Sequence, residues 1–404
     1  MKWQSIRFGD AYSEPSRNGV YKSKEHHGVG SKIVNMGELF RYDFIDRQEM
    51  ARLQMSDDEL SKSGLRSGDL LFGRRSLVEA GAGKCSLVTN LDEDTTFESS
   101  IIRVRVKRDV LDPRFLFYWF KSPSGRGRIR AIVSGVNVKG IRGSDLQNIV
   151  VEHPNLPTQQ RIASMLSAYD NLIENNRRRI ALLEEAARLL YREWFVHFRF
   201  PGHETAKVAD GLPEGWSRPK LGDVCSTNKK SHKAGKLPPR LRYIDIGSVS
   251  TGRVDQATEM AAEEAPGRAR RIAEEGDTIW SNVRPNLRAY ALVTAPRPED
   301  VFSTGFTVLH AEAVSPYFLY LAVTTDDFVK HLENHATGVG YPAVRADDFE
   351  RALVIKPTDA VMAKFHELCQ PVFSQRQQLL DQNAQLTRAS NLLLPRLMDG
   401  RIPV

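Results

Sequence analysis

The stretch QQRIASMLSAYDNLIENNRRRIALLEEAARLLYREWF, residues 159–195, decides the fold class of this chain. Apolar residues and one asparagine recur in it at alternating steps of four and three, and neither Gly nor Pro interrupts them. The positions of this seam are Ile162, Leu166, Tyr169, Ile173, Asn176, Ile180, Leu183, Ala187, Leu190 and Trp194. A repeat of 3.5 residues predicts one long helix that packs along a partner helix.

A second stretch of the same kind supplies that partner. Residues 357–397 contain no glycine and are mostly periodic, although Pro371 is expected to kink the first turns. An offset of 203 residues carries Pro154 to Pro357 and the seam residue Ile162 to Phe365. The two helices are therefore predicted to be copies of one element.

The duplication extends beyond the helices. Four further pairs of segments match in the same order: SGVNVKGIRGSDL (134–146) with TGVGYPAVRADDF (337–349), PRFLFYWF (113–120) with PYFLYLAV (316–323), RSGDLLFGRRS (66–76) with EEGDTIWSNVR (274–284), and WQSIRFGD (3–10) with WSRPKLGD (216–223). A period near 200 residues is too long for a solenoid repeat and indicates a duplicated domain with its helix.

Each half mixes short strand-like runs with short helices before its long helix, which predicts an α+β fold. The expected parts are residues 1–155 as the first domain, 156–198 as the central helix, 199–211 as a linker, 212–356 as the second domain, and 357–404 as the C-terminal helix and tail. The predicted architecture is two duplicated mixed domains separated by two long antiparallel helices, related by a pseudo-twofold axis.

The two helices complement each other in an antiparallel register in which paired residue numbers sum to 559. The pairs are Ile162–Leu397, Leu166–Leu393, Tyr169–Ser390, Ile173–Leu386, Asn176–Asn383, Ile180–Leu379 and Trp194–Phe365, and Leu183 against Arg376 is the poor match. Facing asparagines are a device that fixes register. The alternative is that each helix packs on its own domain, because an amphipathic stripe alone does not name its partner.

Composition narrows the class of protein. The formal net charge of +7 and a pI near 9.2 favour a polyanionic partner such as nucleic acid. The first residues lack the apolar core of a signal peptide, and no apolar run approaches the ~18 residues of a membrane span. Cys85, Cys225 and Cys369 lie far apart, which is typical of a reducing cytoplasm and excludes a CxxC-type zinc site.

The chain resembles the specificity subunit of type I restriction-modification systems. The resemblance lies in PTQQRIASMLSAYDNLIENN (157–176), REWFVHFRFPGHE (192–204), LPEGWSRPKLGD (212–223), LLPRLMDGRI (393–402), GDLLFGRRS (68–76) and the loop before each long helix. The second half departs from this pattern, because DAVMAKFHEL (359–368) replaces the cleaner QQRIASML.

The resemblance implies two target-recognition domains that each read one half of a bipartite site in double-stranded DNA. It also implies that the long helices set the spacer between the half-sites and dock two methyltransferase (modification) subunits, and that a motor-nuclease (restriction) subunit joins them. S-adenosylmethionine, Mg²⁺ and ATP are then expected in the partner subunits, and no cofactor in this chain.

Motifs for catalysis are missing from the sequence. There is no [D/N/S]PP[Y/F] tetrapeptide of an adenine methyltransferase, and the glycine-rich run before Cys85 lacks both the first glycine and the Ser or Thr of a phosphate loop. His331 and His335 have helical metal-ligand spacing but no third ligand, so a solvated helix face is favoured over a metal site. The chain is predicted to be non-catalytic by itself.

Polar side chains in matching loops of the two halves are the DNA-binding candidates. They are Arg74, Arg75, Asn137, Lys139 and Arg142 in the first half, and Asn282, Arg284, Arg288, Tyr341 and Arg345 in the second. Arg and Lys can bind guanine and Asn can bind adenine, but each can also contact phosphate or only water. Two other functions stay open, a self-contained restriction-modification enzyme and a coiled-coil scaffold that binds only proteins.

Overall fold

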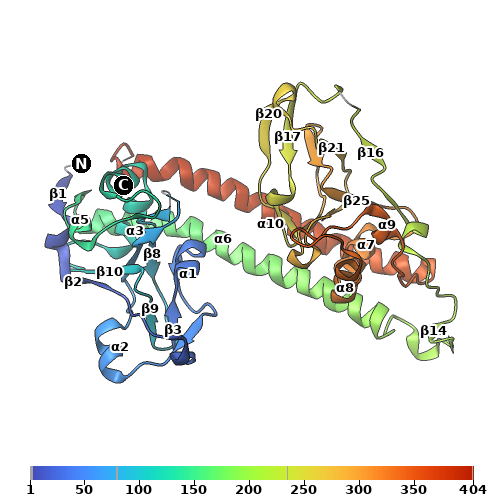
Figure 1. Ribbon diagram of the computed structural model, residues 1–404, viewed down its shortest axis with the longest axis horizontal. Helices are drawn as coiled ribbons and strands as arrows, with labels where there is room; N and C mark the ends of the chain where they lie inside the picture. The colour runs from blue at the N-terminus through green and yellow to red at the C-terminus, as the bar shows by residue number, and fades with distance from the viewer. Residues whose placement is uncertain (1–2, 79–80, 234, 403) are drawn as a thin grey trace. The chain divides into compact units, whose positions relative to one another are not determined.

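The structure is a computed structural model that describes residues 3–78, 81–233, 235–402 and 404. The chain forms two compact units (Figure 1): unit 1 comprises Met1–Asn175 and Asn383–Val404, and unit 2 comprises Asn176–Gln382. The boundary passes through both long helices, α6 (Leu156–Tyr191) and α10 (Asp359–Met398), so each unit contains a segment of each helix. Helix α10 continues through Pro371 as one element.

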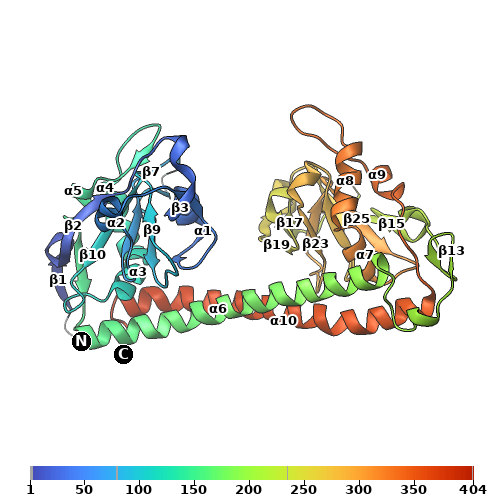
Figure 2. The same cartoon turned by 90° about the horizontal axis from the view of Figure 1, so that it is seen from below.

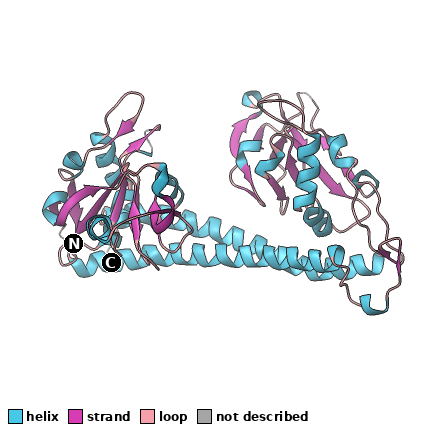
Figure 3. Ribbon diagram, turned by 60° about the horizontal axis from the view of Figure 1, so that its bottom comes forward, coloured by secondary structure: helices cyan, strands magenta, loops and turns pink. Residues whose placement is uncertain are grey.

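Unit 1 is built around a five-stranded sheet in the order β2-β10-β6-β8-β4 and a three-stranded sheet in the order β5-β3-β9. The strands are drawn in magenta in Figure 3. The strands are β2 (Tyr12–Asn18), β10 (Ile101–Val106), β6 (Leu70–Gly73), β8 (Cys85–Val88), β4 (Phe44–Ile45), β5 (Ala51–Leu53), β3 (His27–Val34) and β9 (Thr95–Phe97). The shorter helices are α1 (Met36–Arg41), α2 (Asp57–Ser63), α3 (Pro113–Lys121), α4 (Pro123–Ile132) and α5 (Gly143–Leu146). Strands β3 and β9 run parallel.

Unit 2 repeats this plan. A four-stranded sheet has the order β15-β25-β22-β23, and a five-stranded sheet has the order β16-β21-β24-β17-β20 with β17 parallel to β24. The strands are β15 (Cys225–Thr227), β25 (Phe306–Ala311), β22 (Thr278–Ser281), β23 (Tyr290–Leu292), β16 (Lys230–Ser231), β21 (Ala269–Ile272), β24 (Asp300–Ser303), β17 (Arg240–Ile244) and β20 (Thr258–Ala261). The helices are α7 (Pro316–Ala322), α8 (Asp326–His335) and α9 (Ala346–Glu350).

The duplication holds at the level of single backbone hydrogen bonds. In unit 1 the amide of Phe8 donates to the carbonyl of Ile149 over 2.8 Å, and in unit 2 the amide of Leu221 donates to the carbonyl of Ala352 over 2.7 Å. These bonds fasten the beginning of each duplicated domain to the segment that leads into the long helix following it. The predicted α+β class, with two duplicated mixed domains and two long antiparallel helices, is confirmed.

A short aromatic helix forms the centre of each core. Helix α3 begins at Pro113, and the side chain of Asp112 caps it by accepting from the amides of Arg114 and Phe115. Its six residues 115–120 are all buried, as are the matching residues 318–322 of α7. Burial on every face indicates that each short helix lies inside its unit, between the sheet and the long helices.

The long helices pack both on each other and on the domains. In unit 1, Ile162 and Leu166 of α6 share a buried cluster with Leu394 and Leu397 of α10 and with the aromatic residues of α3. In unit 2, the indole of Trp194 lies 5.7 Å from the ring of Phe365 in a cluster that also contains α7. The two packing modes that the sequence left as alternatives therefore occur together. Within each unit the two helix segments lie side by side (Figure 2).

Polar residues of the seam find partners near the predicted register. In unit 1 the side-chain amide of Asn383 donates to the Ile173 backbone carbonyl over 3.5 Å. In unit 2 the side-chain amide of Asn176 donates to Gln382 Oε1 over 3.5 Å. Arg376, the expected misfit, is only 3% exposed. Its Nε donates to Glu184 Oε1 over 2.5 Å and its Nη2 donates to the Gly252 carbonyl. The buried Arg376 is thus paired with the half-buried Glu184, the residue after Leu183.

Candidate nucleic-acid interface

Two loops of unit 1 pair through a short β-ladder, and the DNA-binding candidates of the first half lie on these loops. We name them loop pair 1, residues 74–78 and 134–142. Strand β7 (Arg75–Ser76) pairs antiparallel with β11 (Lys139–Gly140), so that Lys139 lies opposite Ser76 and Gly140 lies opposite Arg75. The first loop follows directly from the fully buried strand β6, and the second leads into α5. The core of the unit therefore presents the loop pair at its surface.

Glycine makes this ladder possible. A Cβ on Gly140 would lie 2.7 Å from the Arg74 carbonyl oxygen, and a Cβ on Gly135 would lie 2.1 Å from the Val138 carbonyl oxygen. Gly135 also has a φ of 106°, in the left-handed region that other residues avoid. Its counterpart in unit 2, Gly338, has a φ of 108°. The same turn is therefore built into both units.

The predicted residues of loop pair 1 differ in how free they are to contact a ligand. Arg75, Asn137 and Arg142 are exposed, and Lys139 is half-buried. Arg74 is partly engaged, because its Nη1 donates to the Ser99 carbonyl over 3.4 Å. The structure therefore brings Arg75 and Lys139 together on one ladder, with Asn137 and Arg142 on the flanking turns.

Loop pair 2 of unit 2, residues 282–288 and 337–345, has the same connection. The Arg284 amide donates to the Pro342 carbonyl over 2.7 Å, and an isolated bridge joins Val283 to Ala343. An offset of 208 residues carries the first loop of unit 1 onto the first loop of unit 2, and the offset of 203 does the same for the second loop. With these offsets the contacts match those of the β7–β11 ladder. The second group of predicted residues therefore also converges, although it lies far apart in the sequence.

Three side chains of loop pair 2 are fixed by the protein itself. Asn282 accepts from the Thr307 hydroxyl over 2.7 Å, and Arg288 forms an ion pair with Asp326 at the start of α8 over 2.5 Å. The Arg284 guanidinium lies over the ring of Tyr341, 4.6 Å from its centroid. Sequence reasoning missed all three contacts, and the only signal available was the position of these residues after a strand.

Backbone strain marks the same loop. Arg284 and Arg288 have φ angles of 51° and 54°, which place both in the left-handed region. Non-glycine residues adopt this region at an energetic cost and concentrate in it at functional sites. The remaining residue of the prediction, Arg345, is exposed and precedes α9, where its amide donates to Asp348 over 2.8 Å.

Basic residues on α4 add to the charge beside loop pair 1. Arg128 and Arg130 are exposed, and Arg126 donates from Nη1 to the Gly83 carbonyl over 3.1 Å. Burial lowers the pKa of the Arg126 guanidinium. Gly83 in turn donates its amide to the Gly73 carbonyl over 2.7 Å, so the glycine-rich residues 81–83 before Cys85 are buried and tied to β6.

Side chains with catalytic or metal-binding potential are engaged in structural contacts. Burial raises the pKa of the Cys225 and Cys369 thiols to about 12, which disfavours the reactive thiolate. His331 Nε2 contacts the Asp348 carbonyl over 2.8 Å, and His335 Nδ1 contacts the His331 carbonyl over 2.7 Å. Among the described residues, no group of three or more His, Cys, Asp or Glu side chains could hold a metal ion.

The helices were compared with the length and apolar character of a membrane span. Within the described part of the chain, none of them combines the length and the apolar character that crossing a bilayer requires.

Comparisons with known proteins agree with this organisation. The family model described as type I restriction modification DNA specificity domain matches residues 41–185. The specificity subunit of the type I restriction enzyme MjaIX from Methanocaldococcus jannaschii is 24% identical over 95% of this chain and 89% of its own length. The EcoKI specificity subunit of Escherichia coli K12 is 31% identical over 39% of this chain and 35% of its own length.

A solved structure shares the fold. The crystal structure of the type I restriction-modification S subunit from M. genitalium matches with a TM-score of 0.59 at 17% identity, and covers 98% of this chain and 96% of that chain. The solved structure supports the fold, and the family model and the nearly full-length relative support the family. Residues 41–185 match the DNA specificity domain of type I restriction-modification systems, and the chain as a whole is similar to their specificity subunits.

Proposed function

We propose that each unit reads one half of a bipartite site in double-stranded DNA, with loop pair 1 and loop pair 2 as the reading elements. The observation that carries this proposal is that the same two loops, joined by the same ladder, occur in both copies of the domain. Each loop pair carries arginine, which can bind guanine in the major groove or a phosphate. The helices α6 and α10 then set the spacing of the half-sites.

The duplicated helices also support docking of two copies of one partner. Met165 and Leu368 are related by the 203-residue offset, as are Leu189 and Leu392, and all four side chains are 39 to 63% exposed. Met165 and Leu392 belong to unit 1, whereas Leu189 and Leu368 belong to unit 2. Single exposed leucines are common on protein surfaces, but equivalent pairs in both units indicate two copies of one surface.

We assign these surfaces to two methyltransferase subunits, joined by a motor-nuclease subunit. The cofactors of the reaction, S-adenosylmethionine, Mg²⁺ and ATP, are assigned to those partners. Changing Met165 to Glu should reduce the number of bound methyltransferase subunits from two to one, measured by native mass spectrometry, and adding Leu368→Glu should remove the second. Leu182→Glu is the matched control, because Leu182 is exposed but its offset counterpart is the polar Gln385.

A domain exchange tests the division of labour. Residues 1–155 are replaced by those of a related chain, the complex is expressed with its methyltransferase subunits, and the methylated motif is mapped across the genome. One half of the motif should change while the other half and the spacer stay the same. If both halves changed together, independent reading by the two units would be wrong. A protein-binding scaffold would leave the motif unaltered.

A further inference from the structure

The polar residues of loop pair 2 are not equally available for DNA. Asn282 is held by the Thr307 hydroxyl, and Arg288 is held by Asp326. An engaged side chain must lose its partner before it can contact a base, which adds the cost of that contact to binding. Arg284 differs from Arg288, because its contacts with the Gly340 carbonyl and the Tyr341 ring leave most of its N–H donors unused.

The guanidinium of Arg284 is fixed in position without being neutralised. Its central carbon Cζ lies over the Tyr341 ring, 4.6 Å from the centroid, which is within the range of a cation–π contact, and its Nη2 donates to the Gly340 carbonyl over 3.2 Å. Arginine has five N–H donors, so this contact leaves at least two parallel donors for a bidentate acceptor. No acidic side chain forms a salt bridge with Arg284 among the described residues. Both Arg284 and Tyr341 are exposed.

Strain in the backbone supports a functional reason for this placement. Arg284 has a φ of 51°, where glycine would be the favoured residue, and yet the chain has an arginine there. In loop pair 1 the equivalent ladder position is the buried Ser76, which lies opposite Lys139. At this one pair of facing positions, the cation is Lys139 on the second loop in unit 1 and Arg284 on the first loop in unit 2.

We propose that Arg284 reads a guanine in the half-site of unit 2, and that Tyr341 is the positioning residue that holds the guanidinium plane. The donor fork of arginine matches the O6 and N7 acceptors of guanine in the major groove, and no other base presents two acceptors there. Stacking on Tyr341 fixes the fork before DNA arrives, which lowers the entropy lost on binding. This inference rests on the proposed function of unit 2 as a reading domain.

The test maps the methylated motif of the full complex with variants of this chain. The domain exchange first identifies which half-site belongs to unit 2. Arg284→Gly is the first variant, because glycine accepts the left-handed backbone and the loop should keep its path. We expect one G·C position of that half-site to become degenerate, with a loss of discrimination of roughly 5- to 150-fold. The other half-site and the spacer should not change.

Further variants separate base reading from charge. Arg284→Lys keeps the charge but loses the fork, so it should relax the same position while retaining more methylation than Arg284→Gly. Tyr341→Ala should relax that position as well, and Tyr341→Phe should not. Arg297→Ala is the matched control, because Arg297 is an exposed arginine beyond the opposite end of the β22–β23 hairpin.

Results that would contradict the role of Arg284 differ from those that would contradict the proposed function. If Arg284→Gly lowers methylation at an unchanged motif, or abolishes it while Arg284→Lys keeps the original motif, Arg284 contacts phosphate and the inference is overturned. If the relaxed position lies in the other half-site, the inference is overturned as well. If the unmodified chain directs no methylation to a bipartite motif, the proposed function itself fails.

Discussion

Unit 1 and unit 2 contain the same buried carboxylate, but each gives it a different partner. Asp69 and Asp277 occupy equivalent positions, and each caps the turn before it by accepting from a backbone amide, over 2.8 Å in unit 1 and 2.7 Å in unit 2. The strand pairings β6–β10 and β22–β25 place Arg105 and His310 at equivalent positions beside these carboxylates. Duplication thus preserved the acid while the basic residue diverged.

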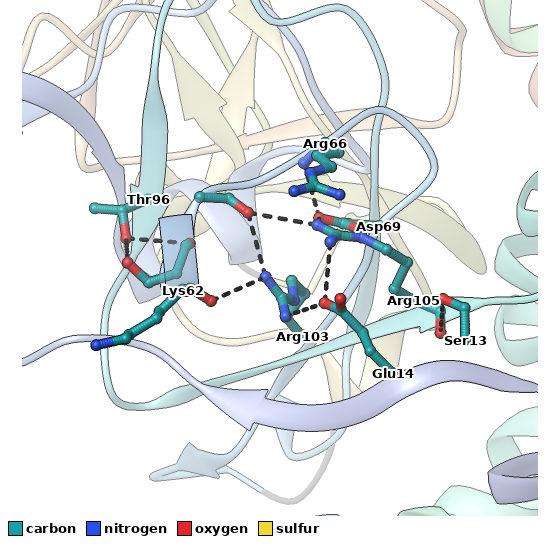
Figure 4. Close-up of polar contacts among 10 residues, drawn as sticks. Ser13, Glu14, Lys62, Arg66, Asp69, Thr96, Arg103 and Arg105 are labelled. Carbon is teal, nitrogen blue, oxygen red and sulfur yellow. Dashed lines mark hydrogen bonds and ion pairs between the residues drawn. The ribbon is translucent and has the colours of Figure 1, made fainter. Parts of the chain in front are cut away.

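In unit 1 the carboxylate belongs to an ionic network (Figure 4). Arg105 contacts Asp69 over 2.6 Å and Glu14 over 3.0 Å, and Arg103 also pairs with Glu14. The side chains of Asp69 and Arg103 are almost fully buried. Hydrogen bonding to Asp69 raises the pKa of Arg105, whereas burial lowers the pKa of Arg103. Both guanidinium groups start from so high a pKa that arginine keeps its charge at physiological pH.

In unit 2 the pair is simpler and nearer to water. His310 Nδ1 lies 2.6 Å from Asp277, and the adjacent ion pairs are Lys230–Glu274 at 2.5 Å and Lys229–Glu312 at 2.8 Å. Histidine changes its charge near neutral pH, whereas arginine does not. The difference teaches that one scaffold can hold the same buried carboxylate against an arginine in one copy and against a histidine in the other.

Removal of Arg105 should have the largest effect on stability. Arg105→Ala leaves Asp69 buried without its cation, which should cost about 3–5 kcal/mol of unfolding free energy. Hydrogen exchange of β6 and β10 peptides in the full chain measures the loss. Arg17→Ala, an exposed arginine of the neighbouring strand, is the control and should cost less than about 0.5 kcal/mol. Equal losses from both variants would contradict the role of the network.

The seam offers the second comparison, because Arg376 of unit 2 corresponds to Ile173 of unit 1 after the 203-residue offset. Arg376→Ala removes the partner of Glu184 and of the Gly252 carbonyl, and should cost about 1–3 kcal/mol. Arg376→Ile restores the apolar residue of unit 1 and should cost less, because it fills the space. Chemical denaturation of both variants measures the difference. A larger loss for Ile than for Ala would show that the ion pair is not replaceable by packing.

Dependence on pH should distinguish the two units. Burial raises the pKa of Asp277 above its ordinary value of 3.8. The folded state therefore holds this proton more tightly than the unfolded chain, and the stability of unit 2 should fall as pH rises through the window above 3.8. Asp277→Asn should flatten this fall, measured by hydrogen exchange of β22 and β25 at several pH values. Glu263→Gln, an exposed carboxylate of the same unit, should leave the slope unchanged.

The smallest expected effect on stability concerns the helix beside each loop pair. Helix α4 presents Arg128 and Arg130, whereas the equivalent α8 begins with Asp326 and Asp327. Changing both arginines to Ala should leave stability within about 0.5 kcal/mol. It should weaken DNA binding of the assembled complex. The slope of log affinity against log salt concentration should also become shallower by up to about two, roughly one for each phosphate contact that is lost. Asp327→Ala in α8 should not reduce this slope, and an unchanged slope for the arginine variant would exclude backbone contacts.

Much of the fold could be predicted from the chain because the relevant signals are local. The seam repeats every 3.5 residues, so its helix is determined by spacing alone, and the duplication adds a second copy in the same order. The same comparison located both loop pairs, because glycines and strand ends mark them in each half. The candidate residues were therefore found as a group, but their individual roles were not separable.

The sequence by itself determined the long helices, the duplicated α+β domains, the order of the elements and the basic character of the loops. Only the tertiary structure decided which charges are engaged: Arg376 with Glu184, Arg288 with Asp326, and Arg284 over Tyr341. The physical reason is distance along the chain. Helix periodicity relates residues three or four apart, whereas these partners lie 192, 38 and 57 positions apart and meet only when sheets and helices have packed.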